Sequence, residues 1–403
     1  GLIAALLVTF SPAALLLSST LMGHTLALCL LMGILLVWRG VLRERSGLAI
    51  VAGALLGFLY ITRPLPALGI GFICAMTALP VLWRALHQKA FLGRLRPFLW
   101  MWVAALLMMG IGWEYNAAVT GDPFKNLYVL IWDYDRPGFG ECCGRSGHTL
   151  QKAINHVEFD LSVAAADQYG WQIGELDAEV ETFWLEGTSY YPNLGLSWLP
   201  LIVGIAMAFW VLAQHNRWLA ALWSLALVAW LLLPGTLPDL QTAVWFSWIW
   251  VTVGVGWFSW PLLILTGRLR WYGVLISLTA VLLLLTMIYW TGNQRYSTRY
   301  FFEMLGTVAI TSALPFAWLV SKNMMLKWLV YGGLLMLTAL TFVTYTMPRI
   351  NILHGFNQVT QSTIDEIAAR RSGDAPLLVV VNGPSSGEGY VRWRAYGMLM
   401  AVT

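Results

Sequence analysis

The feature that most constrains this chain is a series of apolar runs, most of them about 17–25 residues long, which is the length an α-helix needs to cross a bilayer. Because lipid offers backbone groups no hydrogen-bonding partner, such a segment must satisfy its own backbone, as a helix does. Only 11% of the residues are charged, compared with about 25% in an average soluble protein. The sequence therefore predicts an all-α polytopic membrane protein.

We predict eleven membrane spans packed as a helical bundle. The fifteen-residue span at 47–61 contains glycine, which indicates a tilted or partly buried helix. The chain opens at Gly1 inside an apolar run, so we expect it to be an internal piece of a longer protein. The predicted spans are 1–17, 22–38, 47–61, 65–83, 97–115, 195–213, 218–233, 242–266, 271–290, 301–320 and 326–346.

Basic residues collect in alternate loops between these spans. Twelve of them share one set of loops, which holds a single acid, Glu44. By the positive-inside rule this set is cytoplasmic, which predicts a multi-pass protein whose alternate loops are extracytoplasmic. The twelve are Arg39, Arg43, Arg45, Arg84, Lys89, Arg94, Arg96, Arg217, Arg268, Arg270, Lys322 and Lys327.

The same assignment places two long segments outside the cytoplasm. The acidic loop 116–193 separates spans in 1–115 from spans in 194–346, and a C-terminal segment follows at 347–403. Thirteen of the twenty acids lie between Glu114 and Tyr191. A short amphipathic helix is predicted at 176–187. In the C-terminal segment, a helix at 361–373 and a strand at 375–383 indicate the start of a small α/β unit.

Cationic side chains also gather at the outer face of the predicted bundle. Arg63 follows a span and precedes a proline, and Arg295 and Arg299 lie just before another span. His24 occupies a short outer turn. A guanidinium fork can bond two phosphate oxygens at once, so a lipid phosphate is one interpretation. Snorkelling of each arginine to the interface is the other. Spans otherwise nearly free of charge, without an evident repeat, argue against a transporter or channel.

The stretch "IWDYDRPGFGECCGRSGHTLQKAINH" supplies candidate ligands in the outer loop. Asp133 and Asp135 resemble a metal-binding pair under a sugar nucleotide, but an extracytoplasmic loop does not meet sugar nucleotides. A divalent cation held by Asp133, Asp135 and His148 remains one interpretation. The others are local pairing of Asp133 with Arg136, and direct contact with a sugar or acceptor. The remaining candidates are Glu141 and His156.

Four cysteines give no disulfide framework. Cys29 and Cys74 lie within spans and are expected to be inert. Cys142 and Cys143 are adjacent on the predicted oxidising side, as a vicinal disulfide or as two thiols. A Trp-rich stretch at 245–260 either anchors the chain at the interface or faces a partner protein.

Three motifs resemble a known superfamily. "FSPAALLLSSTLMGHTLALCLLMGILL", "AGALLGFLYITRPLPAL" and "STRYFFEMLGTVAI" are similar to segments of GT-C glycosyltransferases of the protein O-mannosyltransferase and aminoarabinose transferase types (glycosyltransferase family 39-like). The matching features are the turn Ser19–His24, Thr62-Arg63-Pro64 and Arg299-Tyr300. The resemblance implies a GT-C-like bundle with its active site at the outer face.

The resemblance also implies a substrate and roles for residues. The donor would be a polyprenyl-phosphate-linked sugar, with Arg63 and Arg299 as phosphate ligands and Tyr300 beside them. The acceptor would be a glycan, lipid or protein. The catalytic acid of such enzymes lies in a first outer loop that this sequence lacks by our count. Many relatives carry an acid at the position of His24, which leaves His24 as a polar contact.

We therefore expect an extracytoplasmic glycosyltransferase whose donor is contacted by Arg63, Arg295, Arg299, Tyr300 and His24, with Asp133 and Asp135 as further contacts. Two alternatives stay open. One is a non-catalytic GT-C-like subunit of a larger complex, and the other is a flippase for a lipid-linked glycan. Membrane lipids are expected partners, and nucleic acid is not.

Overall fold

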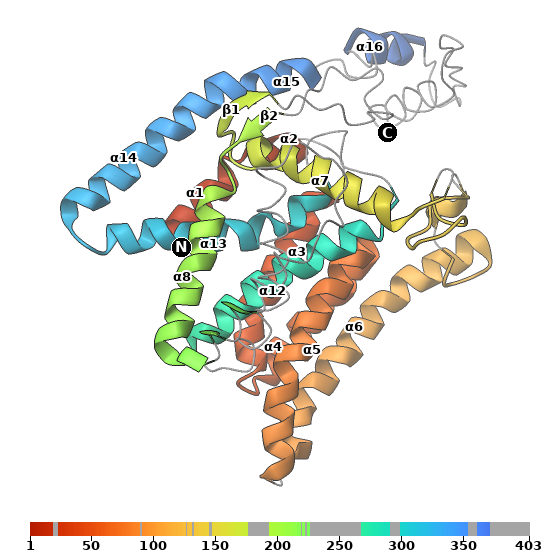
Figure 1. Ribbon diagram of the computed structural model, residues 1–403. Helices are drawn as coiled ribbons and strands as arrows, with labels where there is room; N and C mark the ends of the chain where they lie inside the picture. The colour runs from red at the N-terminus through yellow and green to blue at the C-terminus, as the bar shows by residue number, and fades with distance from the viewer. Residues whose placement is uncertain are drawn as a thin grey trace.

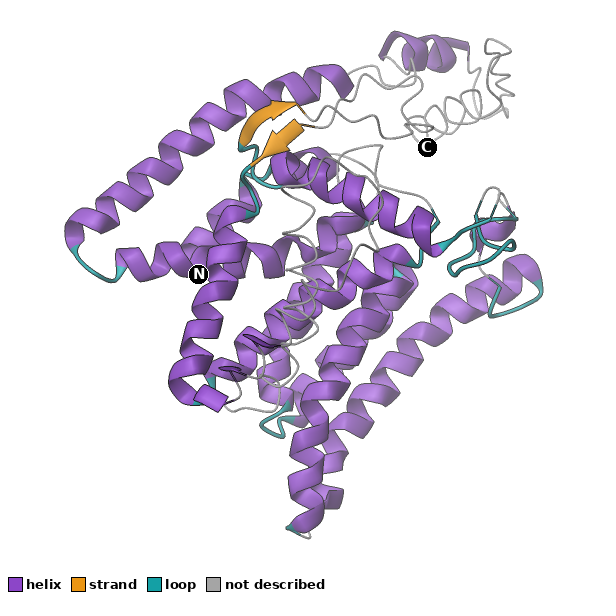
Figure 2. Ribbon diagram, in the orientation of Figure 1, coloured by secondary structure: helices purple, strands orange, loops and turns teal. Residues whose placement is uncertain are grey.

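The architecture comes from a computed structural model, in which helices of the chain form one bundle capped at one end by a helix and a small two-stranded sheet (Figure 1). Helices dominate the described residues, and the strands among them belong to that sheet (Figure 2). The structure describes residues 1–18, 23–88, 91–125, 127–130, 133–144, 147–175, 193–218, 220–221, 224–225, 267–290, 299–353 and 361–370.

The described helices of the bundle follow one another along the chain. They are α1 (Leu2–Thr9), α2 (Pro12–Ser18), α3 (His24–Val41), α4 (Ser46–Thr62), α5 (Pro64–His87), α6 (Phe91–Thr120), α8 (Leu199–His215), α12 (Arg268–Met287), α13 (Leu305–Val320) and α14 (Met324–Thr341). A 3₁₀ turn, η2 (Arg299–Met304), leads into α13.

Six helices of the described part are long and apolar enough to cross a membrane, and α4 and α8 are shorter apolar helices. This agrees with the predicted all-α, multi-pass class and leaves the number of eleven spans unestablished. The predicted spans at 218–233 and 242–266, and with them the Trp-rich stretch, fall mostly or wholly outside the described residues.

The first apolar run departs from the prediction. We expected one span over 1–17, but the helix ends at Thr9 and a second begins at Pro12. Proline has no N–H to donate and clashes with a preceding helical turn, so it is tolerated at a helix start and breaks a helix interior. Two helices of eight and seven residues are each only about 12 Å long or less, so neither crosses a bilayer.

Small residues bring α4 against α6. Gly53 and Gly57 are four positions apart on one face of α4, and a Cβ at either would overlap the α6 backbone at Met101 or Ala105. Close backbone approach over glycines at this spacing is a typical way of packing membrane helices. It accounts for the glycine in the short predicted span at 47–61 and fixes the helix that leads into Arg63.

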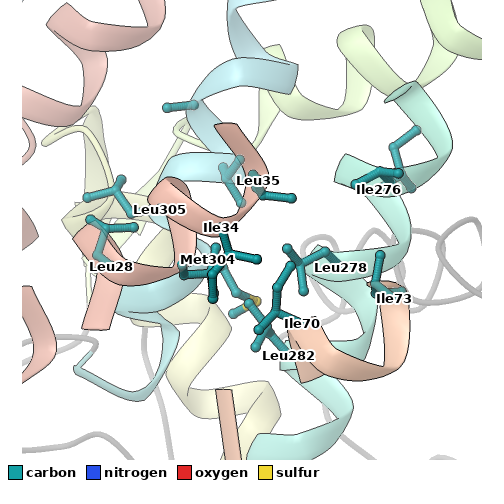
Figure 3. Packing of buried hydrophobic residues seen from close by; sticks show 14 of the residues in the cluster. Leu28, Ile34, Leu35, Ile70, Ile73, Ile276, Leu278, Leu282, Met304 and Leu305 are labelled. Carbon is teal, nitrogen blue, oxygen red and sulfur yellow. The ribbon is translucent and has the colours of Figure 1, made fainter. Parts of the chain in front are cut away.

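A single apolar core joins the helices that carry the site. Leu28, Ile34 and Leu35 of α3 lie among side chains of α5, α12 and η2, as Figure 3 shows. Ile70 and Ile73 of α5 face α12 in the same cluster. The packing holds the start of α3, the start of α5, the end of α12 and η2 in one region, which we call the site end of the bundle.

The opposite end carries the basic loops. The loops that join α3 to α4 and α5 to α6 meet there, because Arg94 forms an ion pair with Glu44. The described basic residues in these two loops and in the adjoining helix ends are Arg39, Arg43, Arg45, Arg84, Arg94 and Arg96. The segregation of charge to one end is the pattern on which the predicted orientation depends.

The acidic segment at 116–193 contains more regular structure than a loop. It includes the end of α6, a 3₁₀ turn η1 (Leu127–Leu130), the helix α7 (Leu150–Asp167) and the strand β1 (Gln172–Glu175). β1 pairs antiparallel with β2 (Asn193–Gly195). Thr149 caps α7 by accepting a hydrogen bond from the Lys152 amide. The amphipathic helix predicted at 176–187 lies outside the described residues.

The last described helices extend beyond the predicted final span. α14 continues through a π-helical turn, η3 (Phe342–Thr346), into α15 (Met347–Leu353). The predicted helix at 361–373 is confirmed as α16 (Gln361–Arg370). The predicted strand at 375–383, on which the α/β character of this segment depended, lies outside the described residues.

Candidate functional site

Arg63 reaches the site because the chain breaks between α4 and α5. The residue before a proline is disfavoured in the helical region, and Arg63 has φ −149° and ψ 88°. Pro64 then opens α5, where its missing N–H costs nothing. The break turns the Arg63 side chain toward the start of α3, and 22% of that side chain is exposed.

His24 is the first residue of α3 and is buried, with 2% of its surface exposed. Its Nε2 lies 3.0 Å from Nη1 of Arg63, and its Nδ1 lies 3.2 Å from Oε1 of Glu303. Arginine can only donate hydrogen bonds, so Nε2 accepts from Arg63. The partners therefore assign a neutral imidazole that donates through Nδ1–H to Glu303.

Glu303 is the residue that sequence reasoning missed. It lies in η2, is 1% exposed, and its Oε1 also approaches Nε of Arg63 at 3.4 Å. Among the described residues, no donor bonds its second oxygen, Oε2, although this atom is buried. An acid in an apolar span, four residues after Arg299, was the available signal, because such residues mark functional positions in membranes.

The Tyr300 ring contacts the guanidinium groups of both Arg299 and Arg63. Arg299 Nη2 donates to the Tyr300 hydroxyl at 3.0 Å, and the Arg299 guanidinium carbon lies 4.8 Å from the Tyr300 ring centre. The Arg63 guanidinium carbon lies 5.6 Å from the same ring centre. A guanidinium is attracted to the face of an aromatic ring at such distances. The site thus joins four of the predicted residues, which are His24, Arg63, Arg299 and Tyr300.

Asp135 ties the acidic segment to this group through α12. The side chain is 5% exposed, and its Oδ1 accepts from the Tyr289 hydroxyl at 2.6 Å and from Trp290 Nε1 at 2.7 Å. The Tyr289 ring packs on Tyr300 with centres 5.3 Å apart. Asp135 was predicted as a ligand contact, but its described partners are these side chains, so it acts on the site through Tyr289 and Tyr300.

Glycine allows the loop to sit this close to α12. Gly144 has φ +77°, and a Cβ there would overlap Trp290. The Gly138 amide donates to the Ile288 carbonyl at 2.8 Å. His148 Nε2–H donates to the Met287 carbonyl at 2.9 Å, which satisfies a terminal carbonyl of α12. The loop 133–148 therefore caps the end of α12.

The predicted metal ligands do not converge. Asp133 is exposed and forms no ion pair with Arg136, Asp135 is bound by Tyr289 and Trp290, and His148 is bound by Met287. In the described part of the chain, no three His, Cys, Asp or Glu side chains are grouped as a metal site requires. Asp133 is exposed and Asp135 is buried, so the two carboxylates lie in different environments, and their contact with a sugar or acceptor stays a prediction.

The neighbouring thiols and imidazole of the acidic segment have distinct environments. Cys142 and Cys143 are free thiols with their sulfurs 3.0 Å apart. Burial lowers the pKa of His156 to about 4, assisted by repulsion from His148 and Lys152. Cys74 is buried as expected, whereas Cys29 is exposed on the apolar surface of α3.

A second buried ionic cluster joins α7 to η3 and α15, and sequence reasoning missed it as well. Asp167 is fully buried and accepts from the Tyr345 hydroxyl and, at 3.2 Å, from Arg349 Nη2. The π-helical turn η3 carries Tyr345, and such turns often occur at functional positions. Asp167 lies in the acidic segment and Tyr345 lies 178 residues later in the chain, so the charge pattern did not indicate that they meet.

The remaining predicted contact, Arg295, lies outside the described residues. Comparisons of the chain with protein families, with curated proteins and with solved structures find no match in any of the three. The assignment of a function therefore depends on the group formed by His24, Arg63, Arg299, Tyr300 and Glu303, which we call the Tyr300 group.

Proposed function

We propose that this protein is a membrane glycosyltransferase. It transfers a sugar from a polyprenyl-phosphate-linked donor to a glycan, lipid or protein acceptor. The reaction takes place at the site end of the bundle, which we assign to the extracytoplasmic face of the bacterial inner membrane. The resemblance of three sequence motifs to GT-C glycosyltransferases supports the proposal, and the Tyr300 group gives it a chemical basis.

The main support for the proposal is that two guanidinium groups lie against the same tyrosine ring. Arg63 and Arg299 both face Tyr300, from different helices, where apolar helices end. Nε and Nη1 of Arg63 are directed at Glu303 and His24, while no described acceptor bonds Nη2 and the side chain is partly exposed. A phosphate at the membrane boundary is the ligand that two such forks suit best.

The same pair suits the chemistry of transfer. When the bond between sugar and phosphate breaks, negative charge builds on the departing phosphate. Guanidiniums fixed in advance stabilise that charge more effectively than water, because they need not reorganise during the reaction. Arg63 is fixed by His24 and Glu303, and Arg299 is fixed by Tyr300, so both are held before a ligand arrives.

Orientation follows from the basic loops at the opposite end of the bundle. Arg39, Arg43 and Arg45 lie at or beside one of these loops, and Arg94 and Arg96 lie in the first turns of α6 beside the next. Positive-inside loops place that end in the cytoplasm. The described parts of the acidic segment then lie toward the outer face, where Asp135 contacts the Tyr300 group through Tyr289.

The test compares Arg299→Ala with Arg94→Ala in purified protein in lipid nanodiscs. Arg299→Ala should weaken binding of undecaprenyl phosphate about 10- to 100-fold, the usual effect of losing a charged hydrogen bond. It should also reduce transfer of labelled sugar from undecaprenyl-phosphate donors. Arg94→Ala removes a charge from the opposite end and should leave both unchanged. Equal affinities for all three proteins would contradict the role of Arg299.

Two other functions give different outcomes in the same preparation. A flippase would move a labelled lipid-linked sugar across vesicles without any acceptor, while a transferase would not. A non-catalytic subunit would bind undecaprenyl phosphate without transferring sugar to acceptors in native membranes. Transfer that depends on Arg299 distinguishes the glycosyltransferase from both.

A further inference from the structure

We propose that the neighbouring thiols of Cys142 and Cys143 are a redox modification site, closed to a disulfide by small disulfides or by disulfide-bearing oxidoreductases outside the cytoplasm. Closure loosens the hold of Asp135 on Tyr289 and so weakens phosphate binding at the Tyr300 group. The location outside the cytoplasm and the effect on phosphate binding rest on the proposed function, whereas the closure itself does not.

The two thiols differ in access and lie within reach of each other. Cys142 is exposed, whereas Cys143 is buried, with 4% of its surface exposed. Their sulfurs are 3.0 Å apart, and a disulfide joins sulfurs about 2.0 Å apart, so closure needs an approach of only about 1 Å. Cys142 can therefore react with an oxidant from solution, and Cys143 can then displace it.

The reaction is two successive thiol–disulfide exchanges. The Cys142 thiolate attacks the disulfide of the oxidant, forms a mixed disulfide and releases one thiol. The Cys143 sulfur then attacks Sγ of Cys142 and releases the second thiol. One S–S bond forms in the protein as the S–S bond of the oxidant breaks. The electrons and protons lost by the pair end on the two thiols of the oxidant, so no other reactant is needed.

A disulfide between adjacent residues is easily reduced. Their Cα atoms are about 3.8 Å apart, whereas disulfides usually join Cα atoms about 4.4–6.8 Å apart. The peptide between the two cysteines must therefore distort when the ring closes, and strained disulfides are the labile, regulatory ones. The pair rests as the dithiol of the structure and closes when disulfide oxidants accumulate.

Close contacts fix Cys143 within the loop. Its amide donates to the Gly140 carbonyl at 3.3 Å. Its sulfur lies against Gly138, because a Cβ on that glycine would be 3.3 Å from Sγ. The Gly138 amide in turn donates to the Ile288 carbonyl at 2.8 Å, just after the end of α12. A change in the backbone of Cys143 therefore disturbs the hydrogen bond by which the loop holds α12.

Gly144, the next residue, transmits the change to Asp135. Gly144 lies so close to Trp290 that a Cβ would overlap that side chain. The Trp290 indole donates to Asp135 Oδ1, the same atom that accepts from the Tyr289 hydroxyl. Displacement of Gly144 therefore moves Trp290 and Asp135. Tyr289 then loses a fixed partner, so its ring shifts against the Tyr300 ring.

The closure is measured on purified protein in lipid nanodiscs treated with oxidised glutathione. The peptide that carries both cysteines should lose the mass of two hydrogen atoms. The amides of Gly138 and Gly144 should lose protection from hydrogen exchange, and dithiothreitol should restore it. Cys142→Ser should show neither change, while Cys29→Ser, which removes an exposed thiol of α3, should behave as wild type. An unchanged peptide mass, a lasting glutathione adduct at Cys142, or closure that leaves both amides protected would overturn the proposal.

Binding of undecaprenyl phosphate tests the effect on the Tyr300 group. Oxidised wild type should bind about 3- to 10-fold more weakly than the dithiol, less than the loss of a charged hydrogen bond, because both guanidiniums remain. Cys142→Ser should bind equally with and without the oxidant. Equal affinities of the two redox states in wild type would overturn the effect on phosphate binding alone. Wild type that binds in neither state would contradict the proposed function and this effect together, while the peptide mass and hydrogen exchange would still decide the closure.

Discussion

Single residues in this protein combine contacts from distant parts of the chain. His24 contacts Arg63 and Glu303, while Asp135 contacts Tyr289 and Trp290. Each acts by fixing the side chain next to it, so substitutions at these positions change the geometry of the Tyr300 group as well as its charge. His156 belongs to another environment, in α7, and its burial gives the acidic segment a dependence on pH.

Acidification should destabilise α7. The pKa of His156 is about 4 in the folded protein and 6.5 in an unfolded reference, so between these values the unfolded state binds more protons. Stability from the neutral form is therefore complete above pH 6.5 and is lost as the pH falls toward 4. At pH 5 the loss is on the order of 1–2 kcal/mol, measured by hydrogen exchange of α7 amides.

His156→Gln is the matched variant for this effect. Glutamine does not titrate, and the described structure shows no hydrogen bond to His156 Nδ1 that it would remove. The variant should lose much less protection between pH 7 and pH 5 than wild type. The same acid-induced loss in both proteins would contradict the role of His156.

At the residue scale, sequence reasoning found side chains that stand out locally and missed contacts between distant parts of the chain. Arg63 and Arg299 were predicted because arginines next to apolar spans stand out in the sequence, and Tyr300 was added by the resemblance of the Arg299-Tyr300 motif to a known superfamily. Glu303 was not, because we judged the spans by their low charge and passed over one acid within them. Asp135 was placed at a ligand, although its hydrogen bonds come from residues more than 150 positions away, which local spacing cannot reveal.

At the scale of elements, the contact between α4 and α6 determines where Arg63 points. Gly57→Ala should destabilise the protein by about 1–3 kcal/mol, because a Cβ would overlap the Ala105 carbonyl and the Met108 side chain. It should also weaken undecaprenyl phosphate binding, since α4 leads directly into Arg63. Thermal unfolding in detergent and the nanodisc binding measurement report the two effects.

Gly71→Ala is the control, because nothing lies within 4 Å of a Cβ at Gly71 of α5. Alanine favours a helix more than glycine does, so this variant should be neutral or slightly stabilising. If the two substitutions behaved alike, close packing of α4 on α6 would not be what holds Arg63.

Elements were predictable where periodicity and length decide them. The bounds of α3, α5 and α13 follow the predicted apolar spans within several residues, and α4 follows its shorter span equally well. The break at Pro12 was missed because a continuous apolar run outweighed one proline in the prediction. The helix α7 was missed because we interpreted the acidic segment as a loop. The buried face of α7 packs against β2 and α12, which are distant in the sequence.

At the scale of the whole molecule, the predicted orientation can be tested with the thiols already present. Cys142 is exposed at the site end, so a membrane-impermeant maleimide should label it in intact spheroplasts. Cys142→Ser, with Cys143→Ser, should abolish this labelling. Adding Ser321→Cys to that variant, in the turn between α13 and α14, should restore labelling only after the membrane is permeabilised. The reverse pattern would invert the orientation and move the site to the cytoplasm.

The contact between His24 and Glu303 also determines when the protein becomes complete during synthesis. Glu303 follows His24 by 279 residues, and ribosomes add about 5–20 residues per second. For roughly 15–55 seconds, therefore, the nascent chain holds His24 and then Arg63 in the membrane without their carboxylate. Until Glu303 arrives, Arg63 is an uncompensated cation at the edge of the lipid, and the Tyr300 group is complete only when the last third of the chain has been made.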